Sequence, residues 1–214
     1  MEPLSVAGPP RGLPLGAELR AASVEQLFEA AGALRRGHFV LKSGRHSDRY
    51  LEKFAVLQYP ALGVELGRRL AGVLIDRDPT LVVGPTTGGA LLAFETARQL
   101  EESLGRTVRG VFAEPMERGT RALRRGWSVN GADRVVLVDD ILTTGASLAE
   151  TVSAVRTAGA SPIAAAVIVD RSTAPVEIGC PIVALGRIEI GSWSAEECPA
   201  CVRGERLVKP GSSL

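Results

Sequence analysis

Three continuously apolar runs alternate with helical segments, and this alternation limits the fold more than any other feature of the chain. The runs are LVVG (81–84), RVVLVD (134–139) and AAAVIVD (164–170), and stretches with helical spacing of apolar residues lie between them. Strands that are buried on both faces have such uninterrupted apolar sequences, and they occur in parallel sheets covered by helices. The sequence therefore predicts an α/β fold with a mainly parallel central sheet flanked by helices.

Weaker patterns fill in the rest of the chain. Ser23 and Gln26 match a capping box at the start of a helix, and Gly37 is expected to end that helix. A second helix is expected over 61–76, helices after the glycine-rich turns at 86–89 and 143–147, and strands over 107–114 and 181–190. The arginine-rich stretch 115–133 is expected to form a long exposed loop or a short hairpin, and the tail from Trp193 to be irregular.

Length and charge exclude some functions and leave others open. The 214 residues suit one domain, expected over 21–214, after a flexible Pro/Gly-rich leader at 1–20. Lys and Arg number 25 against 24 Asp and Glu, so the balance gives no reason to expect nucleic acid or a membrane as partner. No apolar stretch is long enough to cross a bilayer and no signal peptide is evident, so a cytoplasmic location is expected.

The junction VDDILTTGAS (138–147) carries the strongest chemical signal. The apolar strand should deliver Asp139 and Asp140 to the carboxyl edge of the sheet, where open α/β sheets bind ligands. The glycine-containing loop that follows opens a helix, and such a loop presents backbone N–H groups to a phosphate. A ligand with a phosphate at one end and sugar hydroxyls at the other would explain both features. The alternative is that Asp140 caps the helix and Asp139 is a solvated strand end.

VVLVDDILTTGAS closely resembles the phosphoribosyl pyrophosphate (PRPP) motif of type I phosphoribosyltransferases. That resemblance implies the fold of this family, with a small N-terminal hood contributed by about residues 21–55 and the C-terminal tail. It implies that Asp139 and Asp140 hold the ribose hydroxyls and that the loop wraps the 5-phosphate. The PRPP-binding residues implied are Lys42, Thr86, Thr87, Gly88, Asp139, Asp140, Ile141, Leu142, Thr143, Thr144, Gly145, Ala146 and Ser147.

Further stretches are similar to orotate phosphoribosyltransferases. FVLKSGRHSDRY (39–50) resembles their N-terminal segment, in which the residue matching Lys42 reaches PRPP and the backbone near Tyr50 faces the pyrimidine. VIVDRS places Arg171 where the family pairs an arginine with the orotate carboxylate, and Thr143 is also expected to contact orotate. The turn GPTTGG matches the pyrophosphate loop, with backbone donors expected from 86–89. Many orotate enzymes carry a lysine where Gly88 stands.

The arginine-rich stretch departs from the family pattern. The common orotate enzyme has lysine and histidine in a mobile catalytic loop, whereas EPMERGTRALRRGW (114–127) has neither. Arg121, Arg124 and Arg125 are therefore expected to stabilise the leaving pyrophosphate by charge, without general acid catalysis. The resemblance also implies Mg²⁺ bound mainly through the substrate, PRPP and orotate as partners, and a homodimer that shares this loop between subunits. Transfer to another base and a PRPP-binding regulator remain alternatives.

The cysteines and histidines stay open to several interpretations. Cys180, Cys198 and Cys201 are too few for a disulfide framework. The Cys198-Pro-Ala-Cys201 pair fits a structural turn, a metal clip or a redox pair, and a single CxxC with two histidines is a weak zinc signal. His46 is expected at the surface or beside a ligand.

Overall fold

The apolar runs form the centre of a six-stranded sheet with the order β5-β4-β3-β6-β7-β8. Five strands are parallel, and the edge strand β5 pairs with β4 in the antiparallel direction. The strands are β3 (Leu81–Pro85), β4 (Arg109–Pro115), β5 (Arg121–Ala122), β6 (Arg134–Leu142), β7 (Ser161–Asp170) and β8 (Ile182–Arg187). This computed structural model describes residues 12–41 and 43–210. The predicted α/β class with a mainly parallel sheet is confirmed.

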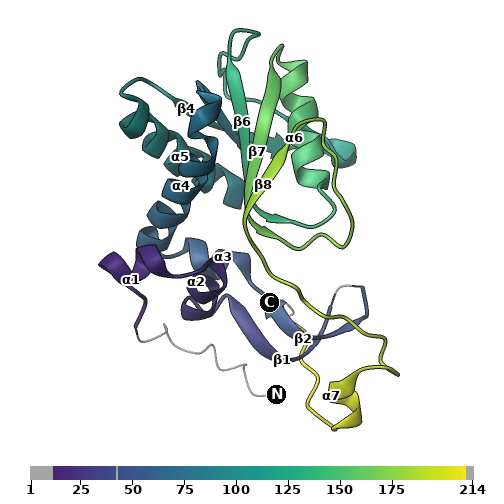
Figure 1. Cartoon of the computed structure of the whole chain (residues 1–214). Coiled ribbons are helices and arrows are strands. Elements are labelled where there is room, and N and C mark those ends of the chain that lie inside the picture. Colours follow the sequence, from purple (N-terminus) through teal and green to yellow (C-terminus); the bar gives the residue numbers. More distant parts are fainter. Residues whose placement is uncertain (1–11, 42, 211–214) are drawn as a thin grey trace. The chain divides into compact units, whose positions relative to one another are not determined.

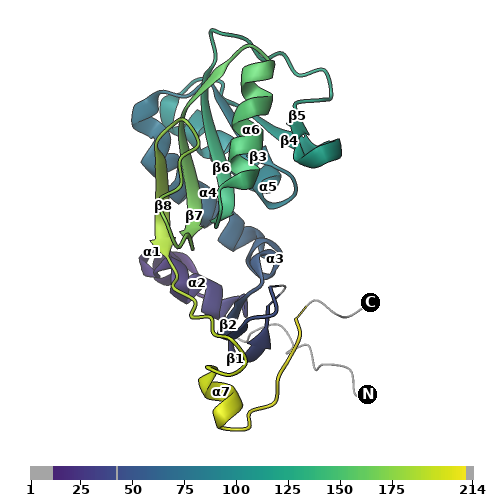
Figure 2. The same cartoon turned by 90° about the vertical axis from the view of Figure 1, so that its right-hand side faces the viewer.

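Helices cover both faces of this sheet. Helices α4 (Pro60–Leu74) and α5 (Gly88–Leu104) pack against each other on one face, and α6 (Ala146–Thr157) lies on the other, as both views show (Figures 1 and 2). From β3 the chain passes through α5 to β4, whereas from β6 it passes through α6 to β7, in the opposite direction along the sheet. The strand order therefore reverses between the neighbours β3 and β6, and such a switch point is where open α/β sheets bind ligands.

The core explains why the central strands are so uniformly apolar. Four successive residues of β6, Val135 to Val138, are fully buried, as are the first three residues of β3. On the α6 face, Leu148, Val152 and Val155 pack onto β3, β6 and β7. A strand covered by helices on both sides buries every side chain, so alternation with polar residues disappears. The chain divides into two compact units, 1–56 with 188–214 and 57–187, and the sheet belongs to the larger one.

One buried carboxylate stabilises α4. Glu65 is 4% exposed, and its Oε1 accepts hydrogen bonds of 2.7 Å from Arg68 and from Arg69. Burial alone would raise the pKa of Glu65, but the hydrogen bonds from Arg68 and Arg69 outweigh it, so that the pKa lies below the ordinary value of 4.5. Because the folded-state pKa is lowered, the ionised carboxylate stabilises the fold above that ordinary value and loses this effect as the pH falls through the folded-state pKa.

We expect Glu65→Gln to lower the free energy of unfolding by about 1–3 kcal/mol at neutral pH, because a buried charged acceptor is lost. Urea unfolding of both proteins should show the difference shrinking as the pH falls from neutral to below about pH 4. Glu102→Gln is the control, since that side chain is 71% exposed and pairs with Arg98 only at 3.4 Å. A difference that stays constant with pH would contradict this account.

The smaller unit contains a two-stranded antiparallel sheet and short helices. Its elements are α1 (Gly16–Ala21), α2 (Val24–Ala30), β1 (Leu34–Val40), β2 (His46–Leu51) and α7 (Pro199–Val202), and α3 (Lys53–Leu57) spans its boundary. The capping box is confirmed: the Ser23 hydroxyl accepts from the Gln26 N–H, and the Gln26 side chain accepts from the Ser23 N–H.

Three expectations about the ends of elements were wrong. Helix α2 ends at Ala30, not before Gly37, because Gly32 takes the left-handed conformation (φ 66°) and Leu34 already starts a strand. The irregular leader does not extend to residue 20, since α1 buries Leu19; residues 1–11 lie outside the described part. The tail contains one helical turn, α7, after Cys198. In the described ranges no helix is both long and apolar enough to cross a membrane.

Candidate active site

The candidate site lies at the carboxyl ends of β3 and β6, on the two sides of the switch point. Strand β3 ends at Pro85 and leads through two threonines into α5, and β6 ends at Leu142 and leads through residues 143–145 into α6. Both helices therefore begin at the same edge of the sheet. The first-turn N–H groups of a helix have no partner within the helix, so both starts favour anionic groups.

The acidic pair is buried at this edge. Asp139 is 6% exposed and Asp140 is 2% exposed. Each carboxylate accepts a hydrogen bond of 2.8 Å from the backbone N–H of the next residue, Asp140 and Ile141 respectively. Helix α6 begins with Gly145 at its N-cap and has no side-chain cap. The alternative of a helix cap and a solvated strand end is therefore wrong, because neither carboxylate is solvated and neither caps α6.

The loop after β6 encloses a small cavity of about 60 Å³. A cavity of this size takes a group of a few heavy atoms. Gly145 has a φ of 78°, and a Cβ atom there would lie 2.3 Å from Val176 Cγ1, so only glycine fits the turn. The lining residues are Asp139, Ile141, Leu142, Thr143, Thr144, Gly145, Ala146, Ser147 and Leu148. The structure thus brings together all predicted residues of this loop, whereas Asp140 does not line the cavity.

Asp140 lies instead against the start of α5. A Cβ atom built on Gly88 would be 2.1 Å from Asp140 Oδ2, so this glycine leaves the space that the carboxylate needs. The expectation that Thr86 offers a free backbone donor was wrong, because its N–H donates to the Ala113 carbonyl at 3.0 Å and thereby continues the pairing with β4. Thr87 and Gly88 remain at the helix start.

The first part of the arginine-rich stretch, up to Ala122, forms a short hairpin of β4 and β5, and residues 123–133 continue as turns and loop, so both expected forms occur. Arg121 is only 11% exposed; its Nε lies 3.2 Å from Glu150 Oε2 on α6, and its Nη1 donates to the Ala113 carbonyl. Arg125 donates two hydrogen bonds to the Glu114 carboxylate, at 3.1 and 2.6 Å. These bonds lower the pKa of Glu114. Glu114 and Glu150, which fix these two arginines, were not predicted from the sequence.

Arg124 differs from these two arginines. Its guanidinium contacts Met116 Sδ at 3.9 Å, and it makes no ion pair with any residue that the structure describes. The side chain is exposed in the loop that follows β5. Of the three predicted cations, Arg124 is therefore the one without a close ion pair among the described residues, although its charge also acts on Glu114.

Arg171 comes directly after β7, at the same edge of the sheet. Its backbone N–H donates to the Leu142 carbonyl at 2.8 Å, which ties it to the end of β6. Next to it, a cavity of about 510 Å³ is lined by the strand-end residues Leu142 (β6), Asp170 (β7) and Arg187 (β8) and by residues 172–176 of the loop after β7. Tyr50 lies on β2 of the smaller unit, with its ring 5.7 Å from that of Phe39. Lys42 lies outside the described residues.

Comparison with known proteins decides the family. Residues 57–195 match the phosphoribosyl transferase domain model. Orotate phosphoribosyltransferase of Pelotomaculum thermopropionicum is 42% identical over 87% of this chain and 94% of its own length. That of Caldicellulosiruptor bescii is 41% identical over 87% of this chain and 95% of its own length. The chain belongs to the orotate phosphoribosyltransferase family.

A solved structure of this family has the same fold. The crystal structure of orotate phosphoribosyltransferase from Aeropyrum pernix matches with a TM-score of 0.59 at 25% identity, covering 77% of this chain and 93% of that one. The type I phosphoribosyltransferase fold inferred from the PRPP motif is thereby confirmed. The matched model covers the whole larger unit, which contains the sheet, the acidic pair and the loop after β6.

Proposed function

We propose that the protein transfers the 5-phosphoribosyl group of PRPP to N1 of orotate, giving orotidine 5′-phosphate and pyrophosphate, a step of UMP biosynthesis. The observation that carries this proposal is the buried acidic pair beside a phosphate-sized cavity at the switch point. The names of the relatives support orotate as the acceptor. Orotate N1 attacks the anomeric carbon, the bond to pyrophosphate breaks, and positive charge develops on the ribose.

The chain itself supplies positioning and charge. The N-terminus of α6 and the hydroxyls of Thr143, Thr144 and Ser147 hold the 5-phosphate, and Asp139 and Asp140 accept hydrogen bonds from the ribose hydroxyls. Fixing the ribose at both ends presents the anomeric carbon to the base in one orientation. The negative carboxylates also stabilise the cationic ribose of the transition state.

Mg²⁺ fits this site. The carboxylates at the end of β6 and the threonine hydroxyls between β6 and the start of α6 offer oxygen ligands. Mg²⁺ is commonly held by one or two carboxylates together with substrate phosphates. When bound, it neutralises the leaving pyrophosphate. On the protein side, the start of α5 at Thr87 and Gly88 binds pyrophosphate oxygens, and Arg124, in the loop that follows β5, covers them.

The base is held at the end of β7. Arg171 donates two parallel hydrogen bonds to the orotate carboxylate, which uracil lacks. The resemblance to the family assigns Lys42 to PRPP and Tyr50 to the pyrimidine.

A spectrophotometric assay tests the function. Purified protein with PRPP and Mg²⁺ should consume orotate, followed by loss of its absorbance, and should leave uracil, adenine and hypoxanthine unchanged. Turnover of another base would replace the proposed acceptor. PRPP binding without any turnover would instead identify a regulator.

The contact between Gly88 and Asp140 gives a further prediction. Because a Cβ atom would lie 2.1 Å from Asp140 Oδ2, Gly88→Ala must displace the carboxylate or the start of α5. We expect kcat/KM for PRPP to fall by up to about 10²-fold. Gly72→Ala on α4 is the matched control, since nothing lies within 4 Å of its added Cβ atom. Equal activities of the two variants would show that Asp140 need not occupy this position.

Sharing of the hairpin between subunits is tested by mixing inactive chains. If Arg124 of one subunit serves the site of its partner, Arg124→Ala and Asp139→Asn chains complement each other. An equal mixture refolded together should recover about one quarter of the wild-type activity, because half of the dimers are mixed and each of these has one intact site. Arg124→Ala mixed with itself is the control. No recovery, or a monomer in size-exclusion chromatography, would contradict sharing.

A further inference from the structure

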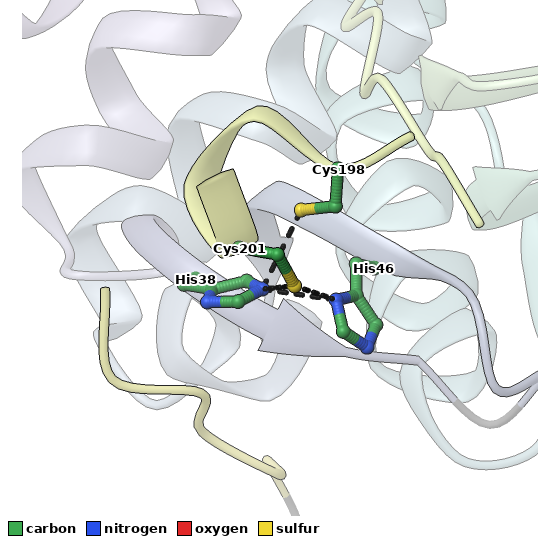
Figure 3. A group of neighbouring side chains, drawn as sticks. All are labelled: His38, His46, Cys198 and Cys201. Carbon is green, nitrogen blue, oxygen red and sulfur yellow. Dashed lines mark hydrogen bonds between the residues drawn. The ribbon is translucent and has the colours of Figure 1, made fainter. Parts of the chain in front are cut away.

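Four side chains of the smaller unit converge on one point. His38 lies on β1, His46 on β2, and Cys198 and Cys201 lie at the two ends of the first turn of α7 (Figure 3). One nitrogen or sulfur atom from each lies within 4.8 Å of the corresponding atom of every other. His38, His46 and Cys198 are buried, with exposures of 4%, 7% and 1%, and Cys201 is partly buried. These are the only two histidines and two of the three cysteines of the chain.

Hydrogen bonds among the four groups do not account for this arrangement. His38 Nδ1 lies 2.9 Å from the Glu205 carbonyl oxygen, which can only accept, so Nδ1 carries the proton and Nε2 presents a lone pair. Three atoms approach that single lone pair: His46 Nδ1 at 3.0 Å, Cys198 Sγ at 3.5 Å and Cys201 Sγ at 3.6 Å. His46 Nδ1 also lies 3.2 Å from Cys201 Sγ. One imidazole nitrogen cannot accept three hydrogen bonds, whereas one cation can accept four lone pairs.

The distances match those between the ligands of a tetrahedral zinc ion. Bonds of about 2.0 Å to nitrogen and about 2.3 Å to sulfur place two nitrogens about 3.3 Å apart and a nitrogen about 3.5 Å from a sulfur. Four of the six separations are close to these values, with 3.0 Å between the nitrogens and 3.2 to 3.6 Å for three nitrogen–sulfur pairs, and all six are within 4.8 Å. We propose that His38, His46, Cys198 and Cys201 bind one structural Zn²⁺ ion. Two thiolates with two imidazoles favour zinc over magnesium or calcium, and four protein ligands leave no open position for a reaction.

The surrounding backbone holds the ligands in place. The Glu205 carbonyl fixes the tautomer and ring orientation of His38, as second-layer partners of metal-bound histidines do. In the segment before α7, the backbones of Trp193 and His46 form two hydrogen bonds with each other, of 2.8 and 2.9 Å. In the segment after α7, the backbone of Val208 forms hydrogen bonds with the backbones of His38 and Val40, of 2.8 and 2.9 Å. The turn that carries both cysteines is therefore anchored to the same two strands that carry both histidines.

The ion would join two segments that are far apart in the sequence. The smaller unit combines residues 1–56 with 188–214, and its two-stranded sheet is too small to be stable by itself. Small units with limited apolar cores commonly need a metal or a disulfide. A bridge from β1 and β2 to the C-terminal segment supplies such a link.

Metal analysis of the purified protein tests this proposal. We expect about one zinc per chain by inductively coupled plasma mass spectrometry after purification without chelators. Cys201→Ser and His46→Asn should each lower the zinc content at least about tenfold. Cys180→Ser is the matched control, since this third cysteine lies in the larger unit and outside the cluster, and it should keep its zinc.

A second measurement uses the wild-type protein, so it does not depend on whether the variants fold. Wild-type protein stripped of metal and titrated with Co²⁺ should develop the intense visible bands of tetrahedral cobalt and thiolate-to-cobalt charge transfer, with an endpoint near one equivalent. Addition of Zn²⁺ should abolish these bands and raise the midpoint of thermal unfolding. Metal-free protein with no cobalt spectrum and no thermal shift would overturn the proposal, as would a Cys198–Cys201 disulfide in the protein as purified. Iron in place of zinc would overturn the assignment of the ion.

Discussion

Replacing both acidic residues, Asp139→Asn with Asp140→Asn, will lower kcat/KM by about 10²- to 10⁴-fold, because each charged hydrogen bond to a ribose hydroxyl contributes about 1.5–3 kcal/mol. Asparagine has the same shape as aspartate, and its Oδ1 can still accept the hydrogen bonds that the backbone N–H groups of residues 140 and 141 now donate. The charge is therefore removed with little disturbance of β6. Steady-state kinetics with PRPP as the varied substrate measures the effect, and each single variant should show part of the loss.

Asp78→Asn is the matched control for this experiment. Asp78 precedes β3 at the opposite edge of the sheet, its side chain is 63% exposed, and it pairs with Arg106. The same chemical change there should leave kcat/KM unchanged. Thermal unfolding of all variants separates loss of activity from loss of fold. If the double variant kept its activity with PRPP, the buried pair would not bind the ribose, and the proposed mechanism would be wrong.

The second large effect concerns the base. Arg171→Ala should lower kcat/KM for orotate by about 10²- to 10⁴-fold, because two charge-assisted hydrogen bonds to the carboxylate are lost together. The affinity for PRPP should change little. The ratio of kcat/KM for orotate to that for uracil should also fall, because the arginine that rejects an unpaired pyrimidine is gone. Competition between orotate and uracil in one reaction mixture measures this ratio.

Arg187→Ala separates specific pairing from general charge. Arg187 ends β8, next to the end of β7, but it already contacts the Asp170 carboxylate at 3.3 Å and the Ser172 carbonyl. It carries the same charge as Arg171 at the neighbouring strand end. Equal losses in both variants would indicate an electrostatic effect of the whole edge and would contradict a dedicated role of Arg171.

The larger unit could be predicted well from the sequence, for a physical reason. Strands such as β6, whose residues Val135 to Val138 are all buried, leave an unbroken apolar run that few other structures produce. Glycine-rich turns directly after such strands locate the ligand-binding edge. The capping box at Ser23 could also be predicted from the sequence, because both of its hydrogen bonds join residues only three positions apart.

The failures occurred where distant residues decide the structure. Leu34 suited the helical spacing of α2 as well as the strand β1, and only the turn at Gly32 separates the two. Arg121 was predicted as a free cation, but Glu150, twenty-nine positions away on α6, holds it. Of the two positions expected for His46, the surface is wrong, because the side chain is buried against Cys201. The pairing of two histidines with a CxxC some 150 positions later has no local signal.

The way the chain passes through its two units has a consequence for synthesis on the ribosome. The chain leaves the smaller unit after Val56 and returns to it at Ile188, so the whole larger unit is inserted into the smaller one. Residues 57–187 can fold as soon as they emerge, because domains generally fold as units from the N-terminal side. The strands β1 and β2 must wait until Trp193, Cys198, Cys201 and Val208 have been made. Strands β1 and β2, although translated before the larger unit, are therefore among the last elements to reach their final structure.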